Sequence, residues 1–272
     1  MTTDGLVQLE ALAQAVRSDT ILVSIMLANN EIGTIQPLAE ISRLVKDKNP
    51  QTLIHTDACQ AAGYLDLKVA ALGVDLLTLN GSKIYGPKGT GVLYVKKGVA
   101  ISKLIHGGGQ ENKRRAGTEN VAGIVGLAKA LELVQAERET EVKRLIELRD
   151  YLISGLLKIP KTFLNGHPIN RLPNNVNVSV LDVEGEAVLL HLDKLGVAIS
   201  TGSACTSGNL EPSHVIIALG HPYEVAHGSL RFSLGQQNTK KDLDYVLKVL
   251  PPIIEQLRKI SPVKLDFDLK KH

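Results

Sequence analysis

The sequence has no tryptophan, only three phenylalanines and only two cysteines among its 272 residues. So few aromatic rings argue against a base-stacking platform for single-stranded nucleic acid. Two cysteines cannot build the disulfide framework of a small secreted domain, so we expect a reducing, cytoplasmic location. Apolar runs are interrupted by Asn, Asp or Lys before they reach the roughly 20 residues of a membrane span. These absences exclude several classes of partner and favour a small-molecule ligand, with no membrane involved.

The composition that remains is that of a folded globular protein. Hydrophobic residues make up 44% of the chain, enough for one large domain or for a large and a small one. The 31 basic and 28 acidic residues give a net charge of +3 and are mixed along the chain. This mixture shows no electrostatic footprint for nucleic acid, so no nucleic-acid partner is expected.

The first half of the chain alternates apolar runs with helical segments. Runs rich in β-branched residues at 20–27, 52–56 and 74–79 predict buried strands, with helices at about 37–48 and 66–72 between them. This order predicts α/β architecture with a parallel sheet covered on both faces. A further strand is expected at 91–95, behind a Gly- and Pro-rich turn. We therefore predict a large domain over residues 1–130.

The second half begins with helical spacing from about 119 to 157, which predicts one long or broken helix between two domains. After Pro160 the pattern predicts a small α+β domain, so that residues 131–272 comprise the interdomain helix and this domain. Its expected elements are an alternating strand at 175–180, a helix near 186–195, a strand at 230–234 and a last helix from Thr239. A loop rich in Gly, Ser and Thr is expected from 200 to 208.

Ligands of a doubly wound sheet lie beyond the carboxyl ends of its strands, and polar residues follow the apolar runs here. Asp57 and Lys83 are separated by about one strand-helix-strand unit, which would place a carboxylate and an amine at neighbouring strand ends. A plain ion pair is one interpretation. The other is that Lys83 forms a Schiff base with pyridoxal phosphate while Asp57 keeps the pyridine nitrogen protonated.

Small polar residues surround that lysine. Asn80, Ser82 and the turn at 86–91 would suit a phosphate, although Gly-Pro-Lys-Gly alone is a weak signal. A second glycine cluster at 106–109 leads into Arg114 and Arg115, which is either another anion contact or a solvated loop.

The two cysteines differ in their neighbours. Cys205 lies among small hydrophilic residues at 200–208, which makes it either a candidate nucleophile or a small buried side chain. Cys59, between alanines, is expected to be buried. His55 lies inside a predicted strand and is expected to be a core histidine with its polar atoms satisfied, and the other histidines lack metal spacing, so no metal is expected.

Arg231 stands alone in the apolar strand at 230–234. A buried arginine needs an anionic partner, and two remain open. One is a structural salt bridge, and the other is a substrate carboxylate held in bidentate fashion.

An ordered set of motifs resembles the cysteine desulfurases, which are class V aminotransferases of pyridoxal-phosphate fold type I. The resemblance runs from about Asp4 to Leu257. The motifs that carry it are Asn29-Asn30-Glu31-Ile32-Gly33, His55-Thr56-Asp57-Ala58-Cys59-Gln60, Gly81-Ser82-Lys83-Ile84-Tyr85-Gly86-Pro87-Lys88-Gly89, His106-Gly107-Gly108-Gly109, Arg115-Ala116-Gly117-Thr118, Ser203-Ala204-Cys205-Thr206-Ser207 and Arg231-Phe232-Ser233-Leu234-Gly235.

The resemblance implies a role for each candidate residue. Lys83 would hold pyridoxal phosphate, Asp57 would pair with its ring nitrogen, and Cys205 would take the substrate sulfur as a persulfide. The remaining implied contacts are Gln60 and Asn30 to the ring hydroxyl and the substrate side, Asn80 and Ser82 to the phosphate, Thr118 to the phosphate from a partner subunit, and Arg231 to the substrate carboxylate.

The Cys205 loop is similar to that of the NifS-like subgroup. The resemblance further implies L-cysteine as substrate, a homodimer, and a sulfur-acceptor protein such as an iron–sulfur scaffold.

The sequence departs from the family pattern in two places. Asn80-Gly81-Ser82-Lys83 stands where members often have Ser-Gly-His-Lys. Members also begin well upstream of this Met1, so the resemblance implies that the chain lacks an N-terminal portion. Two alternatives therefore stay open: a catalytically deficient fragment or one half of a two-chain enzyme, and a selenocysteine lyase or other enzyme of the same class.

Overall fold

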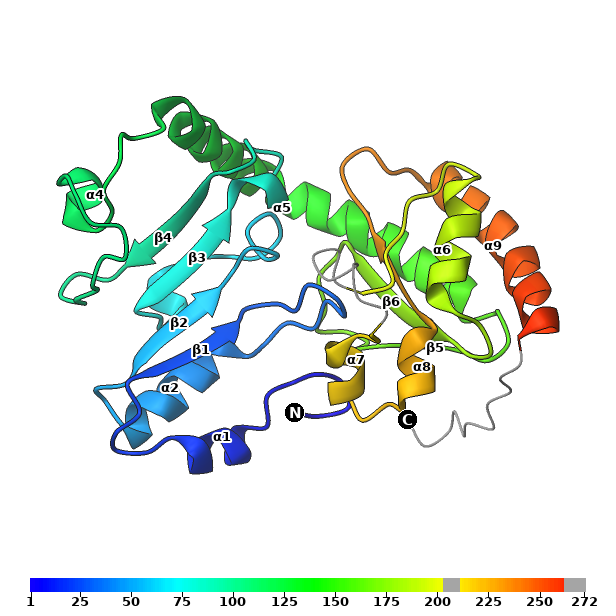
Figure 1. Cartoon of the computed structure of the whole chain (residues 1–272), viewed down its shortest axis with the longest axis horizontal. Coiled ribbons are helices and arrows are strands. Elements are labelled where there is room, and N and C mark those ends of the chain that lie inside the picture. Colours follow the sequence, from blue (N-terminus) through cyan, green and yellow to red (C-terminus); the bar gives the residue numbers. More distant parts are fainter. Residues whose placement is uncertain (203–210, 262–272) are drawn as a thin grey trace. The chain divides into compact units, whose positions relative to one another are not determined.

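The computed structural model describes residues 1–202 and 211–261, which form two compact units (Figure 1). The lysine unit, named for Lys83, comprises residues 9–27 and 37–138. The arginine unit, named for Arg231, comprises residues 1–8, 28–36 and those from 139 onward. The predicted domains, 1–130 and 131–272, stay a prediction; the units differ from them mainly because 28–36, which follows the first strand, joins the arginine unit.

The lysine unit is built on a four-stranded sheet in the order β1-β2-β3-β4. The first three strands are parallel and β4 is antiparallel to β3. Its strands are β1 (Leu22–Met26), β2 (Leu53–Asp57), β3 (Leu76–Asn80) and β4 (Gly91–Val95). Its helices are α1 (Leu9–Ala15), α2 (Leu38–Lys48), α3 (Val69–Leu72), the 3₁₀ turn η1 (Gly81–Lys83) and α4 (Gln110–Lys113).

Burial differs across this sheet. Leu76, Leu77 and Leu79 of β3 are buried, whereas β4 exposes Val92 and Leu93. The prediction of a parallel sheet covered on both faces was made for the first three strands, and the exposed strand β4 is not one of them. Within the described residues β4 pairs only with β3, and its antiparallel direction follows from the short connection between them.

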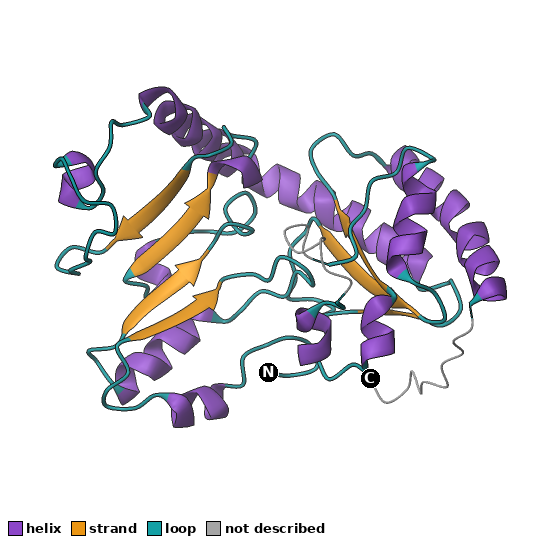
Figure 2. Cartoon of the chain, in the orientation of Figure 1, coloured by secondary structure: helices purple, strands orange, loops and turns teal. Residues whose placement is uncertain are grey.

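The arginine unit contains a three-stranded antiparallel sheet in the order β5-β6-β7 (Figure 2). Its strands are β5 (Thr162–Leu164), β6 (Asn175–Val180) and β7 (Ser229–Ser233). Its helices are α6 (Gly185–Asp193), α7 (His214–Ala218), α8 (Tyr223–His227) and α9 (Lys240–Ile260). The 36-residue helix α5 (Val121–Leu156) runs through the boundary between the units.

Strand β6 departs from the usual alternation of a half-buried strand. Apolar and polar residues alternate along it, yet all six residues are buried. Buried polar side chains need hydrogen-bond partners, and Asn175, Asn177 and Ser179 have them in the same unit. The polar face of this strand is therefore part of the structure and not a solvent-facing surface.

Most predicted elements are confirmed. The strands at 20–27, 52–56, 74–79, 91–95, 175–180 and 230–234 and the helices at 37–48, 119–157, 186–195 and from 239 appear with shifts of a few residues at their ends. The helix at 66–72 is only the four-residue α3. The short elements α1, α4, β5, α7 and α8 were not predicted. Among the described helices, none is long and apolar enough to cross a bilayer.

Candidate active site

Asp57 and Lys83 follow neighbouring parallel strands. Asp57 is the last residue of β2, in register with Thr78 of β3. Lys83 ends the turn η1 that directly follows β3. Because parallel strands end at the same edge of a sheet, the two residues lie at that edge, as their spacing predicted. Asp57 is half-buried, while Lys83 is exposed.

The charges of both residues act on Cys59. Burial and, to a lesser extent, the nearby Asp57 carboxylate together raise the pKa of the Cys59 thiol to about 12, against the opposing effect of the Lys83 ammonium. The carboxylate, the amine and the thiol are therefore within electrostatic reach of one another. Cys59 is half-buried and not fully buried as predicted. With this pKa its thiol stays protonated near neutral pH and is a poor nucleophile.

The turn that carries Lys83 is held by local contacts. Asn80 Oδ1 accepts hydrogen bonds from the backbone N–H of Ser82 at 2.8 Å and from its hydroxyl at 2.7 Å. A Cβ on Gly81 would lie 2.5 Å from Thr90 Oγ1 and 2.9 Å from the Pro87 carbonyl, so only glycine fits this close approach. The amide nitrogen of Asn80 has no hydrogen-bond partner within the described ranges and can serve as a donor.

His55 lies half-buried on β2 with both ring nitrogens in contact with hydroxyls. Its Nδ1 is 2.7 Å from Ser24 Oγ, and its Nε2 is 3.4 Å from Thr78 Oγ1. The prediction of a satisfied histidine is confirmed, although its ring is not completely buried.

Asn30 and Arg231 come together in the arginine unit. Arg231 Nη1 donates to the Asn30 carbonyl at 2.9 Å. The backbone of Arg231 also pairs with Ser200, through N–H···O distances of 2.6 and 3.1 Å. The guanidinium is half-buried, and its carbonyl contact fixes it beside the loop that carries Asn30.

The segment Ala28–Gln36, the asparagine loop, is held by a buried polar network that sequence reasoning missed. The Glu31 carbonyl accepts from the side-chain amides of Asn175 and Asn177, each at 3.1 Å. The Ile32 carbonyl accepts from Arg171 Nη2 at 2.9 Å, and the Gly33 carbonyl accepts from the Leu172 N–H at 2.9 Å. Four successive carbonyls, from Asn30 to Gly33, thus bind partners more than a hundred residues away in the chain.

Arg171 is only 3% exposed, and burial and the nearby Arg149 lower its pKa to about 10. A signal for this network was present in the sequence. Asn175, Asn177 and Ser179 alternate with valines, so one face of the strand carries only uncharged polar side chains. A strand face in contact with water normally carries charged residues, so this pattern indicates a buried polar face.

Two further predicted residues, Gln60 and Thr118, make no side-chain hydrogen bond to the residues above within the described part of the chain. Gln60 is half-buried in the turn after β2, and Thr118 is exposed after Gly117. Cys205 lies outside the described residues. Within those ranges, no three His, Cys, Asp or Glu side chains gather as a metal site.

The lysine unit fits pyridoxal phosphate in its donor set. This cofactor needs an amine for covalent attachment, a carboxylate for its ring nitrogen, and hydrogen-bond donors for its phosphate. Lys83 and Asp57 present the first two at one sheet edge. For the third, Asn80 beside Lys83 presents the N–H groups of its side-chain amide, while the Ser82 hydroxyl here donates to Asn80 Oδ1.

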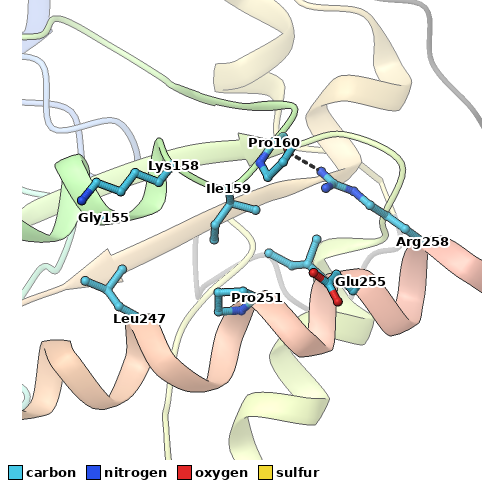
Figure 3. A pocket seen from close by; sticks show the side chains of 9 residues that line it. Gly155, Lys158, Ile159, Pro160, Leu247, Pro251, Glu255 and Arg258 are labelled. Atoms are coloured by element: carbon cyan, nitrogen blue, oxygen red, sulfur yellow. Dashed lines mark hydrogen bonds between the residues drawn. The ribbon is translucent and has the colours of Figure 1, made fainter.

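A pocket of about 370 Å³ lies elsewhere, in the arginine unit, between the end of α5 and α9 (Figure 3). Leu247, Pro251 and Ile159 line it, and at its rim Arg258 Nη2 donates to the Pro160 carbonyl at 2.7 Å. No predicted site residue is among those that line it. This pocket is therefore separate from the candidate site.

Comparisons with known proteins agree with this geometry. The model of the family "Aminotransferase class-V" matches residues 1–246. A "Cysteine desulfurase IscS" of Methanosarcina thermophila is 58% identical over 259 residues, which are 95% of this chain and 64% of that protein. The protein of the same description from Dictyoglomus turgidum is 55% identical, over 98% of this chain and 68% of its own length.

Solved structures give the same result. A "NifS-like protein" superposes with a TM-score of 0.86 at 40% identity, over 96% of this chain and 67% of its own. A NifS-like protein from Rickettsia africae superposes with a TM-score of 0.85 at 31% identity, over 96% of this chain and 69% of its own. The chain thus spans about two thirds of the length of the relatives it matches.

Proposed function

The chain belongs to the class V aminotransferases and, within them, to the cysteine desulfurases, and from this we propose that it removes sulfur from L-cysteine with pyridoxal phosphate as cofactor. The observation that supports this most is the placement of Asp57 and Lys83 at the ends of neighbouring parallel strands. The products would be L-alanine and a persulfide on Cys205.

The residues of the lysine unit would hold the cofactor. Lys83 would bind it covalently, Asp57 would keep its ring nitrogen protonated, and Asn80 and Ser82 would bind its phosphate. Gln60 would contact the ring hydroxyl, and Thr118 would contribute to the phosphate site of a partner subunit in a homodimer. When bound, this cofactor supplies an electron sink for the pair left at the substrate α-carbon.

Two residues of the arginine unit would bind the substrate. Arg231 would hold the carboxylate of L-cysteine, because a guanidinium presents parallel N–H groups to two oxygens. Asn30 would contact the substrate side of the cofactor. The hydrogen bond from Arg231 to the Asn30 carbonyl would hold these two residues in a fixed position relative to each other.

Proton and sulfur transfer would then use two side chains. The Lys83 amine, once released, would take the α-proton of the substrate and act as the general base. The Cys205 thiolate would attack the substrate sulfur: the substrate carbon–sulfur bond breaks, a sulfur–sulfur bond forms, and the carbon is protonated to give alanine. Cysteine and the enzyme thiol thus yield alanine and the enzyme persulfide, with no outside oxidant.

The persulfide would pass to a sulfur-acceptor protein, such as an iron–sulfur scaffold, in the cytoplasm. A second thiol would attack the outer sulfur and restore Cys205. Cys59 is unsuited to either step, because its raised pKa keeps it protonated.

The proposal is tested by adding pyridoxal phosphate and then L-cysteine to the purified chain. We expect a visible absorbance band, a change in that band on addition of cysteine, and release of alanine. Mass spectrometry should find one extra sulfur atom on the peptide that contains Cys205.

The cysteine variants form a matched pair. Cys205→Ser should retain the absorbance change but gain no sulfur, whereas Cys59→Ser should gain sulfur on Cys205. Extra sulfur on Cys59, or on neither cysteine, would contradict the assignment. Alanine from selenocysteine but not from cysteine would overturn the proposed substrate.

A further inference from the structure

The pocket between the end of α5 and α9 has no role in the proposed reaction (Figure 3). Its volume of about 370 Å³ is within the range of sites for small molecules, which measure about 300–1,000 Å³. All of the residues that line it belong to the arginine unit. The chemistry of these side chains decides which class of molecule the pocket can hold.

The floor of the pocket is aliphatic. Leu247, Pro251 and Ile254 lie on α9, and Ile159 points toward Pro251 from the segment that follows α5 (Figure 3). Ile159 and Ile254 are buried, whereas Leu247 and Pro251 remain partly accessible. No aromatic side chain is among the residues that line the pocket, so a ring would find no stacking partner there. The floor therefore favours an aliphatic chain.

One rim of the pocket is fixed by Arg258. Its Nη2 donates to the Pro160 carbonyl at 2.7 Å, and its Nε donates to the Leu181 carbonyl at 3.1 Å. Burial lowers the pKa of Arg258, and the nearby carboxylates of Asp182 and Glu255 oppose this shift. Since two carboxylates already offset its charge, Arg258 shapes the pocket and is not the anchor for a charged ligand.

The other cation of the lining, Lys158, is not offset in this way. It is exposed and directly precedes Ile159 of the floor. Within residues 1–202 and 211–261 its ammonium makes no ion pair and no side-chain hydrogen bond. The carboxylate among the lining residues, that of Glu255, acts on Arg258 instead. An ammonium beside an aliphatic floor is complementary to a molecule with a carboxylate at one end and an apolar chain at the other.

An extended peptide fits this lining less well. Each peptide residue carries an N–H and a C=O group that need partners on burial, and the aliphatic side chains of the floor offer none. The carbonyls of Pro160 and Leu181 at the rim already accept from Arg258. An aliphatic chain has no such groups to satisfy.

We propose that this pocket binds an aliphatic monocarboxylate, with its chain against Leu247, Pro251 and Ile159 and its carboxylate paired with Lys158. A ligand in this position contacts both α9 and the segment that follows α5. The inference is independent of the proposed function, because no residue assigned to the cofactor or the substrate lines the pocket.

The test uses the whole chain with ¹³C-labelled isoleucine and leucine methyl groups, and sodium octanoate below its micelle concentration as the probe. The methyl signals of Ile159, Ile254 and Leu247 should shift until they saturate. Those of Ile41 and Ile54, which are buried in the core of the lysine unit, should not move. Acetate, which has the charge without the chain, should cause no saturable shift, whereas 1-octanol, which has the chain without the charge, should shift the same methyl signals.

Two lysine variants form a matched pair. Lys158→Met removes the charge and keeps the length of the side chain, so it should weaken octanoate binding about three- to fivefold, the effect of losing one exposed ion pair. It should leave octanol binding within about twofold. Lys143→Met is the control, because Lys143 is an exposed lysine of α5 that does not line the pocket. It should change neither affinity.

A floor variant tests the apolar half of the site. Leu247→Asn places an amide in the floor and should weaken octanoate and octanol alike, because the chain loses apolar contact. Far-ultraviolet circular dichroism checks that each variant is folded. Octanoate binding that is unchanged in Lys158→Met, or weakened only as much as octanol binding, would overturn the proposal.

A different occupant would give a different result. If the methyl signals of the pocket shift with protein concentration in the absence of octanoate, a second copy of the chain covers this face and the proposal is wrong. If octanoate causes no saturable shift at these methyl groups, the pocket is not a carboxylate site. None of these measurements uses pyridoxal phosphate or L-cysteine, so they decide the inference whether or not the proposed function holds.

Discussion

Residues 80–90, the lysine turn that carries Lys83, and the asparagine loop both follow strands of the first sheet, but they are held in opposite ways. The bonds around Asn80, Ser82 and Thr90 link residues two or three positions apart, together with a few backbone contacts of the same hairpin. The asparagine loop is bound by partners from 133 to 201 positions away, and by residues 4–7, which lie 29 to 31 positions before it. The conformation of the lysine turn thus depends on residues close to it in sequence, whereas that of the asparagine loop depends on the completed fold.

This difference predicts which variants should impair chemistry and which should impair stability. Side chains of the lysine turn are largely exposed, so their replacement should leave the fold intact. Partners of the asparagine loop are buried, and their loss leaves donors or acceptors unsatisfied. Three predictions test this contrast.

The largest effect is expected for Lys83→Ala. The visible band that pyridoxal phosphate acquires on binding should disappear, because Lys83 is the amine placed next to Asp57 at the strand ends. The midpoint of urea unfolding should stay within error, since the side chain is exposed. Absorbance titration and far-ultraviolet circular dichroism measure the two effects.

Lys97→Ala is the matched control, because Lys97 is also an exposed lysine of the same unit and follows β4, outside the turns considered for the phosphate. It should bind the cofactor as the unaltered chain does. If the band persists in Lys83→Ala and vanishes in Lys97→Ala, the site is assigned to the wrong lysine.

A change in stability should follow from Asn177→Ala. The variant loses the hydrogen bond to the Glu31 carbonyl and leaves the Asn165 amide without its Asn177 acceptor. We expect a loss of about 2–4 kcal/mol in the free energy of unfolding, measured with urea, because both groups are buried.

Asn170→Ala is a suitable control for that change, since the side chain of Asn170 makes only a marginal 3.5 Å contact with His167 near the surface. It should cost less than about 0.5 kcal/mol. Equal losses for the two variants would remove the distinction between the buried network and ordinary surface amides.

The smallest effect concerns pH and the buried carboxylate of Asp75 in the lysine unit. Burial alone would raise the pKa of Asp75, but hydrogen bonds from Lys46, the Ile54 N–H and Lys96 outweigh it and lower the pKa. A carboxyl with a lowered folded pKa stabilises the protein above its unfolded value, about 3.9, and loses this contribution as the pH falls further.

Asp75→Asn should therefore cost about 1–2 kcal/mol at pH 7 and progressively less below pH 4. Urea unfolding of both chains at pH 7, 4 and 3 measures the difference. A cost that does not depend on pH would show that the charge of Asp75 adds nothing to the free energy of unfolding beyond the packing of its side chain.

The same contrast explains which features of the fold and the site could be predicted from the sequence. β-Branched runs and the spacing from Asp57 to Lys83 predicted the sheet and its ligand edge, because each signal lies within one strand-helix-strand unit. The short helices α7 and α8 carry too few residues for a helical period to be detected. The acceptor that Asn175 and Asn177 share, the Glu31 carbonyl, could not be predicted, since only the tertiary fold brings these residues together.

The long-range character of the asparagine loop has a consequence for the order of events during synthesis. The arginine side chain that binds the Asn30 carbonyl is added 201 residues after Asn30 itself. At about 5–20 residues per second, this delay is roughly 10–40 s. For part of that time the carbonyls of Glu31, Ile32 and Gly33 also lack their partners, since residues 171–177 are added 139 to 146 residues after them. This segment therefore reaches its native structure only after much of the chain that follows it has been made.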